Sequence, residues 1–252
     1  MSWAGNRRTT YFGAVVLVLL FIIGVPIFFL LDREPSCSDG IQNQDEEGVD
    51  CGGSCQAVCA VQVSEPVVLW VRALEVVPGV YNAVARVENS NFDAGVSSAQ
   101  YTFTLVDDEG LLVAKRNGRT FISPNSTFVI FEGGIETGNR VPSRSFFEFV
   151  GELSWIVTPR ATLPKVQNEV LTGEDASPRL TSTLENTTSR DMFDIEVAAI
   201  IFDREDNVIA ASKTTASRID KHDTQDVVFT WPNPFIREVS RIEITPRVPF
   251  GN

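Results

Sequence analysis

The stretch Ala99-Gln-Tyr-Thr-Phe-Thr-Leu-Val106 alternates between apolar and polar side chains. Tyr101, Phe103 and Leu105 fall on one face of an extended chain, and the residues between them fall on the other. This period of two predicts a β-strand with one buried side. Similar short runs are separated by turn residues and lie at 67–76, 81–87, 127–132, 146–150 and 153–157. The pattern predicts an all-β fold in which two sheets pack face to face.

The same strand and turn pattern occurs twice. Leu105-Val-Asp-Asp-Glu-Gly-Leu-Leu-Val-Ala114 aligns without gaps on Ile201-Phe-Asp-Arg-Glu-Asp-Asn-Val-Ile-Ala210, and each predicts a strand, an acidic turn and a second strand. An Asn-containing turn precedes each hairpin and a similar late strand follows it. These landmarks lie at 88–91 and 185–188 for the turns, and at 155–159 and 242–246 for the late strands.

The recurrence predicts two tandem Ig-like β-sandwiches of common origin, although a common β-meander could give part of the match by chance. We expect the first sandwich at 63–160 and the second at 161–252. Pro164, Gly173 and Pro178 interrupt the strand pattern between them, so the boundary is expected within 159–175.

The amino-terminal region contains a long apolar run. Residues 11–31 include no charged side chain, and Arg7 and Arg8 stand just before them. At about 1.5 Å per residue, a helix of this length crosses a bilayer core of roughly 30 Å. The basic pair predicts a cytoplasmic tail at 1–10 and an extracytoplasmic remainder. A cleaved signal peptide is the alternative, but its apolar core is usually shorter and ends in an A-x-A pattern, which is absent here. The sequence thus predicts a single-pass signal anchor in the cell membrane.

Composition limits the partners. The chain has 33 acidic and 21 basic residues and a formal net charge of −12. An acidic surface repels phosphate backbones, so no nucleic-acid binding is expected.

The sequence contains no recognisable catalytic constellation. Its single histidine, His222, lies in a turn-like segment, and no nucleophile-elbow, phosphate-loop or dinucleotide motif accompanies it. The acid pairs Asp107–Asp108 and Asp203–Glu205 stand at expected hairpin turns, where such side chains usually favour the turn itself. We therefore expect no enzyme activity and no small-molecule substrate.

All four cysteines lie close together, at Cys37, Cys51, Cys55 and Cys59. In an extracytoplasmic compartment, an even and clustered set predicts two disulfides, with all three pairings open. A zinc site is the rival interpretation, but the spacing matches no common zinc finger. We expect a disulfide-stapled acidic neck at 32–62.

Acidic residues fill the loop between the first two cysteines. The residues with oxygen ligands suited to calcium are Asp39, Asn43, Asp45, Glu47 and Asp50. Asn43, Asp45 and Glu47 alternate and Gly48 follows, which matches the first half of an EF-hand loop. The twelfth position of that loop is Ser54, which cannot supply the bidentate carboxylate. A calcium site and a solvated linker both remain open, and no other cofactor is expected.

The neck, with the pattern C-x-DGI-x-NQ-x-E-x-GVDCGG-x-C from Cys37 to Cys55, resembles a cysteine motif of exported bacterial and archaeal surface proteins. In those proteins the motif often lies between an anchor or secretion signal and β-rich domains. The resemblance implies surface exposure and a small stapled knot that could bind a cation, and it implies no enzyme activity.

The order of turns and strands in both repeats is similar to FxLYD-type and late-embryogenesis-abundant Ig-like domains. That similarity implies a sandwich fold with a binding or spacer role, and it carries over no site.

Two N-x-[ST] acceptors, at Asn125 and Asn186, lie in expected loops and could carry glycans. Taken together, these features predict a membrane-anchored extracytoplasmic interaction or spacer protein. The alternative is an accessory docking subunit of a membrane complex for secretion, transport or cell-wall assembly. The expected partners are the membrane and other envelope or surface proteins.

Overall fold

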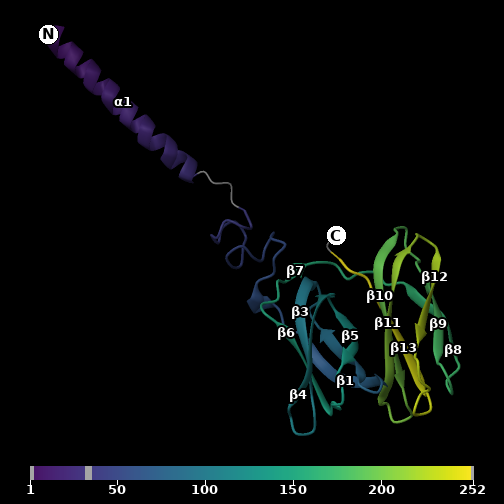
Figure 1. Ribbon diagram of the computed structural model, residues 1–252. Helices are drawn as coiled ribbons and strands as arrows, with labels where there is room; N and C mark the ends of the chain where they lie inside the picture. The colour runs from purple at the N-terminus through teal and green to yellow at the C-terminus, as the bar shows by residue number, and fades with distance from the viewer. Residues whose placement is uncertain (1–2, 32–35, 251–252) are drawn as a thin grey trace. The chain divides into compact units, whose positions relative to one another are not determined.

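The computed structural model describes the backbone of residues 3–31 and 36–250, and the side chains of 11–27 and 36–250 (Figure 1). The chain divides into two compact units, Met1–Cys55 and Gln56–Asn252.

The first unit contains helix α1 (Trp3–Leu31) and most of the cysteine-rich neck. From Tyr11 to Ile27 its side chains are mostly apolar and exposed, and Pro26 lies within the helix. The predicted tail at 1–10 and the end of the predicted anchor at 28–31 lie outside the residues whose side chains are described. Within the described part of the chain, no helix has both the length and the hydropathy required of a membrane span.

The second unit consists of antiparallel sheets. A short 3₁₀ helix, η1 (Ala60–Gln62), precedes the first strand. The strands of the first pair of sheets are β1 (Val67–Val77), β2 (Val80–Asn89), β3 (Ala94–Val106), β4 (Leu112–Ile122), β5 (Ser126–Glu136), β6 (Arg144–Val150) and β7 (Ile156–Val157). One sheet has the order β1-β2-β5 and the other the order β4-β3-β6, while β7 pairs with the beginning of β3.

The second pair of sheets repeats this order. Its strands are β8 (Lys165–Thr172), β9 (Arg179–Glu185), β10 (Met192–Phe202), β11 (Val208–Ile219), β12 (Thr224–Thr230) and β13 (Arg241–Arg247). The sheet β8-β9-β12 corresponds to β1-β2-β5, and the sheet β11-β10-β13 corresponds to β4-β3-β6. The prediction of an all-β fold is confirmed. The boundary expected near residue 160 falls between β7 and β8 and stays a prediction.

Each sheet pair encloses its own apolar core. In the first, Tyr101, Phe103 and Leu105 are buried as their alternation predicts, and Phe147 packs edge-on against Phe103 with ring centroids 5.0 Å apart. In the second, Leu180 and other side chains of β9, β10 and β12 fill the corresponding space.

A third apolar cluster joins the two sheet pairs. Val84 of β2 and Val129 of β5 pack there with Ala211 of β11 and with β10, whose Ile200 and Phe202 contribute. The outer face of sheet β1-β2-β5 therefore packs on the outer face of sheet β11-β10-β13, side by side in Figure 1. The sequence had predicted tandem sandwiches without this interface.

One predicted landmark was wrong. The segment 242–246 belongs to β13, which pairs with β10 just as β6 pairs with β3. The segment 155–159 contains β7, which pairs with Ala94 and Gly95 at the other end of β3. The structural counterpart of 242–246 is thus β6, and the similarity between the two predicted late strands does not reflect equivalent positions.

Candidate functional site

All four cysteines form disulfides. Cys37 is bonded to Cys55, with an S–S distance of 1.99 Å, and Cys51 and Cys59 are disulfide-bonded as well. The prediction of a disulfide-stapled neck is confirmed. Because no thiolate remains available as a ligand, the rival zinc interpretation is wrong.

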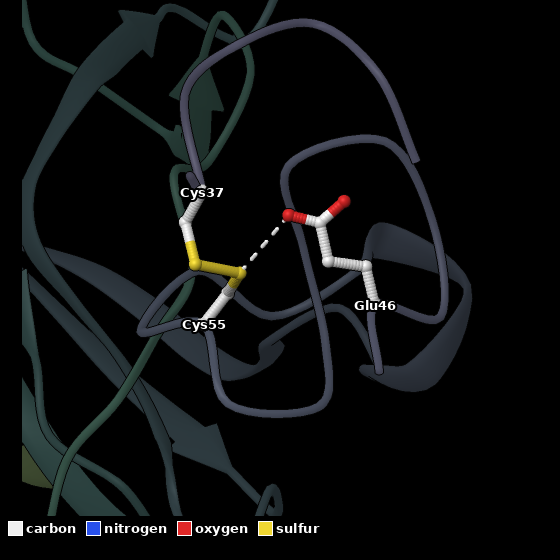
Figure 2. A group of neighbouring side chains, drawn as sticks. All are labelled: Cys37, Glu46 and Cys55. Carbon is white, nitrogen blue, oxygen red and sulfur yellow. Dashed lines mark hydrogen bonds between the residues drawn. A yellow bond between two sulfur atoms is a disulfide. The ribbon is translucent and has the colours of Figure 1, made fainter. Parts of the chain in front are cut away.

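Glu46 lies against the Cys37–Cys55 bond (Figure 2). Its Oε1 is 3.3 Å from Cys55 Sγ, its Oε2 accepts a hydrogen bond from the backbone N–H of Asn43 at 3.1 Å, and the residue is only 9% exposed. A disulfide sulfur carries no proton, so the contact with Cys55 is not a thiol hydrogen bond. These three side chains are the one metal-type cluster among the described residues, but the disulfide removes the thiolates a metal would need.

The predicted calcium ligands act mainly as turn caps. Asp39 Oδ1 accepts the N–H of Ile41 at 2.9 Å, and its Oδ2 accepts the side-chain amide of Asn43, also at 2.9 Å. The Asp50 carboxylate accepts the N–H of Gly40 at 3.0 and 3.1 Å. The structure thus brings Asp39 and Asn43 together and holds Asp50 by a separate contact.

Asp45 accepts the hydroxyl of Ser54 at 2.8 Å, across the loop. Within the described residues, no three of the predicted acidic ligands, Glu47 included, have oxygens within 4.8 Å of one another. A calcium ion would have to compete with the hydrogen bonds that these carboxylates already make. Calcium binding at the neck stays a prediction.

The second glycan acceptor, Asn186, is fully buried. Its Nδ2 donates to the carbonyl of Arg190 at 2.8 Å and to those of Ile219 and Asp220 at 3.1 Å. A glycan would replace one hydrogen of this nitrogen and would have to displace these contacts in the folded chain. Glycosylation at Asn186 stays a prediction. Asn125 is exposed, and a glycan there stays a prediction.

Asn89 has the corresponding role in the first sheet pair. It is 1% exposed, and its Nδ2 donates to the carbonyls of Ala94 and Ser123 at 2.9 Å. In both Asn89 and Asn186, Oδ1 accepts the N–H two residues further along the chain, at 3.1 and 3.0 Å. Asn89 thereby links the turn between β2 and β3 to the connection between β4 and β5. Asn186 likewise links the turn between β9 and β10 to the connection between β11 and β12.

The acidic hairpin turns are also built alike. Asp107 Oδ1 and Asp203 Oδ1 each accept the N–H four residues further on, at 2.8 Å. The other carboxylate oxygen accepts from Arg140 at 2.5 Å in the first copy and from Arg237 at 2.6 Å in the second. Both aspartates therefore close turns, as their position in the sequence predicts.

These contacts keep both aspartates ionised. The hydrogen bond from Arg140 is the main cause that lowers the pKa of Asp107. Burial alone would raise the pKa of Asp203, but hydrogen bonds from the backbone of Asn207 and from Arg237 outweigh it and lower the pKa to about 2. A proton donor at neutral pH needs a raised pKa, so neither group is suited to general acid catalysis.

Arg247, in the second sheet pair, makes hydrogen bonds to residues of both sheet pairs. From β13 it donates to Thr120 Oγ1 at 3.1 Å, to the carbonyl of Phe121 and to Glu196 Oε2 at 3.1 Å. Its guanidinium lies over the rings of Phe121 and Phe128, 4.1 and 4.6 Å from their centroids. Burial lowers the pKa of Arg247 to about 10, which leaves the group charged at neutral pH.

Other polar contacts cross the same interface. Arg86 of β2 forms an ion pair with Glu243 of β13 at 2.7 Å. Asn233, in the connection between β12 and β13, donates to the carbonyl of Val76 at 2.9 Å. The interface therefore combines an apolar centre with oriented polar contacts around it.

Clefts open beside the free edge of β1. Near its beginning, a cleft of about 420 Å³ lies between 60–68 and the end of β6; we call it the edge cleft. Near its end, a groove of about 600 Å³ lies between β1, β11 and the loop that follows Trp231. Both volumes are in the range of sites that hold small ligands or short segments.

Comparisons with known proteins assign no family. No family model matches the chain, and no curated protein matches it. Among solved structures, red sea bream transglutaminase matches with a TM-score of 0.23 and 9% sequence identity, over 71% of this chain and 29% of that chain. The match spans less than a third of the transglutaminase, and a likeness this weak supports no conclusion about activity.

Proposed function

We propose that the protein is a membrane-anchored extracytoplasmic interaction or spacer protein without catalytic activity. In this proposal 11–31 is the anchor, the neck is a stapled connection, and 63–160 and 161–252 are Ig-like domains. The observation that supports it most is the buried interface around Ile200 and Arg247. Tandem domains that share only a linker move independently by default, whereas a large apolar interface holds them at one angle.

A fixed angle suits a protein that presents a surface at a set distance from a membrane. The anchor itself is supported by the uncharged run at 11–31 and the basic pair Arg7 and Arg8. The absence of catalysis is supported by the acid pairs at the hairpin turns, where Asp107 and Asp203 are engaged by turn N–H groups and by arginines.

The alternative, an accessory docking subunit of an envelope complex, is favoured by the clefts along β1. A terminal strand with an apolar cleft beside it is a common place for a partner segment to bind.

The test uses the full chain with a carboxyl-terminal tag in intact cells. We expect it to sediment with membranes, and external protease should remove the β-sheet region but spare the first thirty or so residues. Isolation in mild detergent then separates the candidates: stoichiometric envelope proteins indicate a docking subunit, and the chain alone indicates a free-standing interaction or spacer protein. Recovery without detergent, or protection of the β-sheet region, would overturn both.

A further inference from the structure

The edge cleft lies beside β6 and β1, each of which ends its sheet among the described strands. β6 is the last strand of the sheet β4-β3-β6, and β1 is the first strand of the sheet β1-β2-β5. The two strands contact each other along this side of the sandwich. A terminal strand presents backbone N–H and C=O groups that a further strand can pair with.

The lining of the cleft combines apolar side chains with three glutamates. Its lining includes Val63, Val68, Phe149, Leu153 and Trp155. Next to it, Val67, Val68 and Leu69 are 55%, 36% and 45% exposed at the beginning of β1. On β6, Phe146 and Val150 are 53% and 45% exposed, and by strand alternation they share a face with Glu148, which lines the cleft. An added strand could cover these side chains with its own, as neighbouring strands in a sheet do.

The charge around the cleft has one sign. The lining includes Glu65, Glu148 and Glu152, all exposed, and it includes no lysine or arginine. The whole chain has a net charge of −12, so its wider field favours the same sign of partner. Nucleic acids and anionic lipids are repelled by this surface, whereas a basic protein segment is attracted to it.

We propose that the edge cleft binds an extended segment of a partner protein in which aliphatic side chains alternate with lysine or arginine. The segment pairs with the free edge of β6, places its aliphatic side chains against Val68, Phe149 and Leu153, and directs its basic side chains to the three glutamates. Backbone pairing supplies affinity in such complexes, and pockets for alternate side chains supply specificity. This inference rests on the proposed interaction role and names the kind of partner.

The probe is a fluorescein-labelled heptapeptide of alternating lysine and valine, titrated with the detergent-solubilised full chain and followed by anisotropy. We expect saturable binding at least about tenfold tighter than that of the matched glutamate–valine peptide. An N-methylated lysine–valine peptide, which cannot make the backbone hydrogen bonds, should bind at least about tenfold more weakly.

The variant Glu148→Gln/Glu152→Gln should weaken binding of the lysine–valine peptide roughly three- to tenfold, since it removes two exposed attractive charges. The matched control Glu169→Gln/Glu174→Gln changes net charge equally at exposed sites in the second sheet pair, and it should leave the affinity within about twofold.

Equal binding of the charge-reversed or N-methylated peptide, or equal losses in the two variants, would overturn the proposal. A dimer in sedimentation that Glu148→Gln/Glu152→Gln dissociates would make the occupant a second copy of this chain and would also overturn it. If the peptide fails to bind while the chain still sediments with membranes and is cleaved from outside, the cleft assignment fails and the proposed function stands.

Discussion

At the residue scale, the closest likeness between the sheet pairs lies in buried polar contacts. The sequence identified the Asn-containing turns and the acidic hairpins, and the structure gives Asn89 and Asn186, and likewise Asp107 and Asp203, the same hydrogen-bonding role. The arginine partners were not predicted. They lie more than thirty residues from their aspartates in the chain, and local turn chemistry contains no information about them.

The buried asparagine of the second copy gives a direct test. Asn186→Ala leaves the carbonyls of Arg190, Ile219 and Asp220 without their shared donor, so we expect a loss of about 3 kcal/mol in the free energy of unfolding, measured with urea. The control Thr187→Ala alters an exposed neighbour and should change it by less than about 0.5 kcal/mol. Equal effects of the two substitutions would show that Asn186 is not a structural clamp.

Asp203 should make stability depend on acid pH. Its folded pKa of about 2 lies below the ordinary value of 3.8, so the folded state favours the carboxylate. The stability that this group contributes is present above about pH 4 and is lost as the pH falls from 4 towards 2. As the pH falls from 4 towards 2, the urea concentration at half-unfolding should decrease more steeply for the wild type than for Asp203→Asn.

Asp175→Asn, which alters an exposed aspartate, is the control for this pH dependence and should keep the wild-type slope. Parallel pH profiles for wild type and Asp203→Asn would contradict the assignment of a lowered pKa to Asp203.

At the scale of elements, alternation predicted strands well wherever one face is buried and the other is wet. β3 follows this rule in part: Tyr101, Phe103 and Leu105 lie inside and Gln100 is exposed, but Thr102 on the opposite face is only 3% exposed. β10 differs because both of its faces are buried: Val197, Ala199 and Ile201 enter the core of the second pair, and the side chains between them enter the interface. The uninterrupted apolar run Val197-Ala-Ala-Ile-Ile-Phe202 is typical of a strand covered on both sides.

That run was the available signal for the interface, but sequence alone does not say what covers the second face. The late strands show a different limit. The motif shared by 155–159 and 242–246 suggested equivalent positions, but pairing with β3 and β10 is decided by register over the whole strand. A few matching residues do not fix that register. The disulfides were predicted from clustering alone, while the choice of Cys37–Cys55 required the fold of the neck.

At the scale of the whole molecule, the second unit should behave as one rigid body. Val84, Ile200 and Phe202 are almost completely buried at the interface, and each buried side chain of this size contributes about 1.5–3 kcal/mol. Spin labels at Glu109→Cys and Asp175→Cys, both exposed turn positions in different sheet pairs, should therefore give one narrow distance distribution. Every native cysteine is in a disulfide, so the labels attach only at the introduced sites.

Ile200→Asp should separate the two sheet pairs, because it places an unpaired charge in the apolar interface at a cost of several kcal/mol. We expect a broadened distance distribution and two calorimetric transitions in place of one. Ile200→Ala, which only leaves a cavity, should give a smaller shift in the same direction. Thr230→Asp adds the same charge at an exposed position of β12, opposite Arg179, and should change neither measurement. A broad distribution in the wild type, or an unchanged one in Ile200→Asp, would mean that the interface does not hold the sheet pairs together, and the rigid-body basis of the proposed role would be lost.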